Sequence, residues 1–185
     1  SMRADREAVL RYALSECRSI VGTVLEFGVY QGATLRILAG KLGGRRSAVG
    51  FDSFQGLPEA WGTLLPRGHF GTPVPVFPPE YNIRLEVGRI EETLPAFLAR
   101  ERNAIALVHI DCDLYATTRF VLDRVLPRMP PGAVIVFDEY YGYPTFADHE
   151  YRAWQEVLHA GGGSARPLAY SSHSCAYQIE RPWRL

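Results

Sequence analysis

The stretch VGTVLEFGVYQGATL, residues 21–35, decides the fold. Its first half is apolar and rich in β-branched residues, which predicts a strand over residues 22–26. Gly28 and Gly32 follow at once, and a helical pattern begins at residue 34. Glycines in the turn after a first strand let a ligand approach the backbone closely. The stretch therefore predicts an α/β sheet with a cofactor site at the end of its first strand.

Strand and helix patterns alternate along the rest of the chain, which predicts parallel strands joined by crossover helices. A last pair of strand patterns, joined by residues 172–174, suits an antiparallel hairpin at the sheet edge. The sum is a doubly wound, mostly parallel, Rossmann-like sheet of seven strands. Helices are expected at 5–19, 34–41, 90–100, 115–126 and 145–160, and strands at 22–26, 47–52, 83–87, 104–111, 133–138, 166–171 and 175–180.

The length predicts one domain, 1–185, since 185 residues can bury a sizeable core. Residues 1–20 are expected to carry an N-terminal helix. Residues 53–81 are rich in glycine and proline and predict a long loop, which we interpret as a lid over the substrate. Its aromatic side chains either exclude water from the reaction or anchor the loop.

Composition excludes several function classes. The 20 basic and 20 acidic residues give no net charge, so nucleic acid is an unexpected partner. No apolar run reaches the ~20 residues of a membrane span, and the start resembles no signal peptide. Three widely spaced cysteines suit a reducing, cytoplasmic compartment. Lys41 is the single lysine, which we interpret as a sign of a bacterial source.

The residues around the glycine turn favour S-adenosylmethionine (SAM) over a dinucleotide. Glu26 and Gln31 stand where a dinucleotide site has its outer glycines, and an acidic residue there suits a sulfonium. Asp52 ends the next strand, where a carboxylate can accept hydrogen bonds from ribose hydroxyls. Alternatively, the glycines only permit close packing and Asp52 caps a turn. The expected cofactor-binding residues are Glu26, Phe27, Gly28, Gly32, Asp52, Ser53, Gly88, Ile90 and Asp111.

Carboxylates follow the fourth and fifth strands. Because neighbouring strands lie ~4.8 Å apart, Asp111, Asp138 and Glu139 are expected to converge on a hard cation such as Mg²⁺. The ion would hold a substrate hydroxyl and lower its pKa, with Asp111 as a candidate base. Asp113 is interpreted as a helix N-cap. His109 lies either near the cofactor or metal, or in the core.

Four motifs carry a family resemblance: LEFGVYQGATL, GFDSFQGLPEAW, HIDCDLYATT and PPGAVIVFDEYYGYP. In this order they resemble the macrocin O-methyltransferase family over residues 21–180. The resemblance implies a class I methyltransferase that uses SAM with Mg²⁺ on Asp111, Asp138 and Glu139, and that methylates sugar hydroxyls. The family usually has a second aspartate where Glu139 stands, and its N-terminal segment and lid are longer. Its lid histidine is matched only by His69, in a poorly matching context.

The sequence thus predicts a SAM-dependent, Mg²⁺-assisted O-methyltransferase with Asp111 and His69 as catalytic residues. The acceptor is expected to be a small molecule bearing a hydroxyl, such as a sugar or a natural-product glycoside. The alternative is a non-catalytic SAM- or nucleoside-binding module of a larger assembly; an NAD-dependent oxidoreductase is disfavoured by the missing phosphate-binding glycines. The oligomeric state stays open, a homo-oligomer included.

Overall fold

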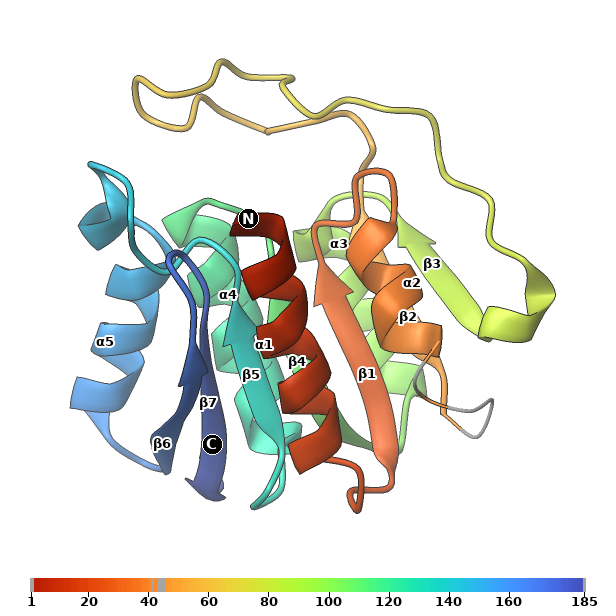
Figure 1. The fold of residues 1–185 in the computed structure, drawn as a ribbon, viewed down its shortest axis with the longest axis vertical. Helices are drawn as coiled ribbons and strands as arrows, with labels where there is room; N and C mark the ends of the chain where they lie inside the picture. The colour runs from red at the N-terminus through yellow and green to blue at the C-terminus, as the bar shows by residue number, and fades with distance from the viewer. Residues whose placement is uncertain (1, 41, 43–45, 185) are drawn as a thin grey trace.

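A computed structural model describes residues 2–40, 42 and 46–184 of the chain (Figure 1). The predicted alternation of strands and helices is confirmed. The helices are α1 (Met2–Glu16), α2 (Ala33–Gly40), α3 (Ile90–Arg100), α4 (Tyr115–Val125) and α5 (Glu150–Ala160), with 3₁₀ turns η1 (Pro79–Tyr81), η2 (Leu126–Arg128) and η3 (Phe146–Asp148). The strands are β1 (Gly22–Phe27), β2 (Ala48–Asp52), β3 (Ile83–Val87), β4 (Ala104–Ile110), β5 (Val134–Phe137), β6 (Ser164–Tyr170) and β7 (Cys175–Arg181).

The strands form one seven-stranded sheet in the order β3-β2-β1-β4-β5-β7-β6. β1 to β5 run parallel, and β7 is antiparallel to both β5 and β6. The predicted fold class is therefore confirmed. The hairpin enters the sheet through its second strand, so that β6 forms the edge. The order reverses between β1 and β4, the place where doubly wound sheets bind ligands.

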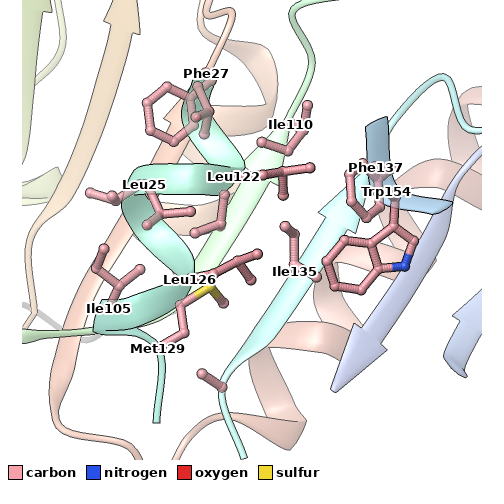
Figure 2. Close-up of a cluster of buried hydrophobic side chains, with 14 of the residues drawn as sticks. Leu25, Phe27, Ile105, Ile110, Leu122, Leu126, Met129, Ile135, Phe137 and Trp154 are labelled. Carbon is pink, nitrogen blue, oxygen red and sulfur yellow. The ribbon is translucent and has the colours of Figure 1, made fainter. Parts of the chain in front are cut away.

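Helices cover both faces of the sheet, as Figure 1 shows. α1 and α2 pack on one face, where Leu10 and Ala13 of α1 meet apolar side chains of β1, β4 and β5. α3, α4 and α5 cover the other face, and Figure 2 shows Leu122 of α4 directed at the central strands. Trp154 of α5 packs on Phe137 of β5, with ring centroids 5.3 Å apart. This double cover explains why the central strands are almost wholly apolar.

Several element ends differ from prediction by about one to five residues. α1 ends at Glu16 rather than at residue 19. α5 begins at Glu150 rather than at residue 145, because η3 and an irregular His149 precede it. The predicted end of a helix at Lys41 lies outside the described residues. In the part of the chain that the structure describes, no helix is both long and apolar enough to cross a membrane.

Candidate functional site

A cavity of about 290 Å³ opens at the carboxyl ends of the parallel strands. Hydrogen bonds continue the sheet beyond the strands and hold the loops there. The amide of Gly28 donates to the carbonyl of Phe51 (3.0 Å), and the amide of Asp111 donates to that of Phe27 (2.8 Å). The amide of Asp138 donates to the carbonyl of Ile110 (2.9 Å). These loops beside the cavity are thus hydrogen-bonded continuations of the central strands.

Gly28 is required by the close approach of two loops. Its φ of 89° lies in the left-handed region, and a Cβ added there would lie 1.8 Å from the carbonyl oxygen of Asp111. No side chain fits without moving the loop after β4. Gly28 therefore lets the loops after β1 and β4 meet beside the cavity.

Asp52 fastens the glycine turn. Its Oδ2 accepts hydrogen bonds from the amides of Val29 and Tyr30, both at 2.8 Å, and its Oδ1 accepts one from the amide of Phe54 at 2.7 Å. This is the capping role that the sequence left open as the alternative. Asp52 also lines the cavity, and a carboxylate offers about four acceptor sites, so the predicted bond to ribose remains compatible with these contacts.

The structure brings most, but not all, of the predicted cofactor residues to the cavity. Those that line it are Gly28, Asp52, Ser53, Gly88, Ile90 and Asp111. Three do not line it. Glu26 and Phe27 have no exposed surface, and Gly32 lies against the ring of Phe77, where a Cβ would come within 2.4 Å.

Glu26 instead faces His109 on the neighbouring strand, and both side chains are fully buried. Glu26 Oε2 and His109 Nδ1 lie 2.9 Å apart, and His109 Nε2 lies 3.8 Å from Asp138 Oδ1. Burial alone would lower the pKa of His109, but the flanking carboxylates of Asp138 and Glu26 hold it well above its usual value. His109 is therefore a core histidine, the second of its two predicted roles, and it links β1 to the acidic cluster.

The acidic side chains predicted after β4 and β5 reach the same cavity. Asp111, Asp113, Asp138 and Glu139 all line the cavity. Burial, and then the charge of Asp138, raise the pKa of Asp111 well above its usual range. Burial raises the pKa of Asp113 to about 7, with the charges of Glu139 and Asp138 adding to the effect. A low-dielectric cavity rich in carboxyl groups is where proton transfer is expected.

The interpretation of Asp113 as a helix N-cap is wrong. α4 has Leu114 at its N-cap position, with no side-chain cap. Asp113 adopts a left-handed conformation, with φ at 64°, and is buried beside the cavity. A short polar side chain tolerates this conformation better than most. The loop thus directs the residue to the site rather than to the helix.

Arg6 of α1 is the cation of this cluster. Its Nη1 lies 2.9 Å from Asp138 Oδ2, and its Nη2 forms an ion pair with Glu139. Among residues 2–40, 42 and 46–184, no group of three His, Cys, Asp or Glu side chains is arranged to hold a metal ion. The three carboxylates predicted to bind Mg²⁺ therefore do not form a Mg²⁺ site in this arrangement. The guanidinium of Arg6 already pairs with two of them, Asp138 and Glu139.

The loop over residues 53–81 runs across this end of the sheet, as Figure 1 shows. Gly56, Leu57, Trp61 and Phe70 line the cavity from it. The loop is ordered by its own hydrogen bonds, including one from the amide of Leu57 to the carbonyl of His69 (2.8 Å). The His69 side chain is exposed, packs edge-on against Phe70 and does not line the cavity. Its predicted catalytic role gains no support.

Sequence reasoning missed two ionisable residues of the acidic cluster, Arg6, which lines the cavity, and Glu150, which does not. Arg6 stands one helical turn before the buried Val9 and Leu10. It therefore lies on the apolar face of α1, and a charged residue on that face is the sequence signal that could have identified it. Glu150 is fully buried, and burial together with the charge of Asp113 raises its pKa well above the usual range. One of its oxygens accepts a hydrogen bond from the amide of Glu139. Nothing in the sequence distinguishes Glu150 from an exposed residue at a helix start.

Comparisons with known proteins agree with this geometry. A family described as "Methyltransferase domain" matches residues 25–140, more than half of the chain. The calicheamicin methyltransferase CalS11 superposes with a TM-score of 0.79 at 25% identity, over 93% of this chain and 77% of that one. The O-methyltransferase NovP superposes with a TM-score of 0.73 at 20% identity, over 96% of this chain and 80% of that one.

A curated relative comes from Streptomyces olivaceus, an 8-demethyl-8-(2,3-dimethoxy-alpha-L-rhamnosyl)-tetracenomycin-C 4'-O-methyltransferase. It is 31% identical over 58 residues, which are 31% of this chain and 21% of the relative. The match thus spans about a fifth of the relative's own length. The resemblance to the macrocin O-methyltransferases in particular stays a prediction.

Proposed function

The chain belongs to the methyltransferase-domain family, and from this premise we propose that it transfers the methyl group of SAM to a hydroxyl of a small molecule. One observation carries the proposal. A cavity at the switch point of the sheet joins a glycine turn to a group of buried carboxyl groups of raised pKa. The turn suits a nucleoside ligand, and the carboxyl groups suit removal of a hydroxyl proton.

The acceptor class follows from the relatives and from the cavity walls. The Streptomyces olivaceus enzyme is named for a rhamnosyl compound, and CalS11 for calicheamicin. Trp61 and Phe70 face the cavity from the loop, and aromatic rings of this kind pack well on the apolar faces of sugars. We propose a sugar hydroxyl, free or within a natural-product glycoside, as the acceptor.

In the proposed reaction the chain binds the nucleoside, positions the acceptor hydroxyl and accepts its proton. The glycine turn, Asp52 and the segment Gly88 to Ile90 hold the nucleoside, so that the sulfonium carbon faces the acceptor oxygen. The O–CH₃ bond forms as the S–CH₃ bond breaks, and S-adenosylhomocysteine leaves. The hydroxyl proton passes to Asp113 or Asp111. The pKa of Asp113, about 7, is suited to a general base near neutral pH.

Mg²⁺ is the finer prediction from the sequence, and it forms no part of this mechanism. Arg6 already pairs with Asp138 and Glu139, and a divalent ion would have to displace it. His69 has no role in it either, since its side chain lies outside the cavity. The non-catalytic alternative is disfavoured because burying several carboxyl groups costs stability, a cost typical of catalytic sites.

The test incubates the protein with labelled SAM and a panel of free and nucleotide-linked sugars. Methyl transfer is measured as labelled product and as released S-adenosylhomocysteine. We expect Asp113→Asn to lower the rate by ~10²-fold or more, the usual effect of removing a general base. The matched control is Asp123→Asn on the exposed side of α4, where the carboxylate pairs with Arg119. Failure of the wild type to bind SAM would refute the proposal.

A further inference from the structure

Among the residues that the structure describes, two arginines line the cavity, and they differ in their surroundings. Arg89 is mostly exposed, with 60% of its side-chain surface accessible, and lies 3.6 Å from Glu91. Arg6 is mostly covered, at 27%, and contacts Asp138 and Glu139 together. Asp138 is nearly buried, and burial alone would raise its pKa; the hydrogen bond and charge of His109, and then the charge of Arg6, lower it. Arg6 is thus built into the acidic cluster, whereas Arg89 lies on the rim.

The two carboxylates that Arg6 contacts follow β5, where the sequence pattern places two of three metal ligands. A guanidinium presents its N–H groups as a planar fork, which matches a pair of carboxylates. Mg²⁺ demands near-octahedral oxygen ligands at ~2.0–2.1 Å and dehydrates reluctantly. It could reach Asp138 and Glu139 only by expelling a positive charge that is already hydrogen-bonded there.

The packing of α1 fixes the position of Arg6. Val9, Leu10, Ala13 and Leu14, which follow it on the same helix, are buried against the sheet. Figure 1 shows the N-terminal end of α1 at the edge where the parallel strands end. Residues three and four apart share one face of a helix, so the buried stripe carries Arg6 to this edge. The charge is held by a rigid element rather than by a loop.

We propose that Arg6 is the resident cation of this site and supplies within the chain the positive charge that the motif pattern assigns to Mg²⁺. SAM binding then needs no divalent ion. Under the proposed function, on which this last step rests, methyl transfer needs none either. Arg6 is a positioning residue: it neutralises Asp138 and Glu139 and keeps them beside the cavity.

The experiment compares wild type, Arg6→Gln and Arg6→Lys after removal of metals with EDTA and dialysis. Binding of Mn²⁺ is followed by the loss of the electron paramagnetic resonance signal of the free ion, with Mg²⁺ as competitor. SAM affinity is measured calorimetrically with EDTA and with Mg²⁺. The matched control is Arg11→Gln on the same helix, where the side chain is exposed and lies 3.6 Å from Glu7.

We expect wild type, Arg6→Lys and Arg11→Gln to bind no Mn²⁺ at this site and to bind SAM equally in EDTA and in Mg²⁺. Arg6→Gln removes the ion pair of Glu139 and one of the two cationic contacts of Asp138, so it should gain a Mn²⁺ site that Mg²⁺ competes for. Its SAM affinity should rise about tenfold on adding Mg²⁺, which corresponds to ~1.4 kcal/mol. A merely structural role for Arg6 would create no metal dependence.

Two results would overturn the proposal. One is stoichiometric Mn²⁺ binding by wild type that Asp138→Asn abolishes. The other is a folded Arg6→Gln that binds no more Mn²⁺ than wild type does. If Arg6→Gln does not fold, the wild-type titrations decide alone. Either overturning result leaves SAM binding intact, whereas absence of SAM binding under both conditions would refute the proposed function itself.

Discussion

Replacing Asp113 by Asn should stabilise the protein, and the gain should depend on pH. The folded-state pKa of about 7 exceeds the ordinary value of 3.8 by roughly three units. At ~1.4 kcal/mol per unit this difference corresponds to an upper bound of ~4 kcal/mol. The folded state binds the proton more tightly, so wild type loses stability from this group as pH rises from about 4 to 7. Asn carries no charge and suits the left-handed conformation.

Urea denaturation of Asp113→Asn and wild type in EDTA, at pH 5 and pH 8, measures the effect. The variant should be more stable than wild type at pH 8, with a smaller advantage at pH 5. Asp123→Asn is the control, because its carboxylate is exposed and paired with Arg119 on the helix surface. A variant no more stable than wild type at pH 8, or an equal gain at both pH values, would refute the reasoning.

Two further substitutions test the frame around the cavity. Gly28→Ala should abolish SAM binding, because its Cβ would meet the carbonyl of Asp111; Gly62→Ala, also at positive φ but with open space around it, should bind normally in the same calorimetric titration. Glu26→Gln should cost ~3–5 kcal/mol in urea denaturation, because it removes the carboxylate that contacts Nδ1 of the buried His109 and helps to raise its pKa. Glu156→Gln, which removes a partly exposed carboxylate paired with Arg152 on α5, should change the midpoint much less, and equal effects of the two would contradict the assignment.

The sequence predicted the fold well because its signals are local. The apolar strands and the glycine turn at residues 28–32 can be recognised from adjacent residues and from the spacing of apolar side chains. The crossover rule limits the possible topologies, but the strand order itself comes from the structure. Element ends were less exact: α5 was expected from residue 145, but the 3₁₀ turn η3 occupies residues 146–148 and the helix begins at Glu150.

The site was predictable at the level of strand ends. Asp111 and Asp138 reach the cavity because parallel strands end at one edge. The direction of each side chain was not predictable. Glu26 lies opposite His109 on the neighbouring strand β4, a contact that depends on the register of the two strands. Asp113 was misassigned because a left-handed residue before a helix has the same sequence signature as an N-cap.

Arg6 was missed because the ion pair joins residues 133 positions apart. No local sequence pattern predicts such a contact. The family resemblance instead implied Mg²⁺ as the cation beside Asp138 and Glu139. The pairing depends on how α1 packs against β5, which only the assembled structure shows.

A calorimetric titration of the metal-free wild type with SAM tests the account most directly. The account predicts saturable binding of one SAM per chain in EDTA, weakened in Asp52→Ala because the amides of Val29, Tyr30 and Phe54 lose their acceptor. Absence of saturable binding, with or without Mg²⁺, in a protein that is shown to be folded, would contradict it.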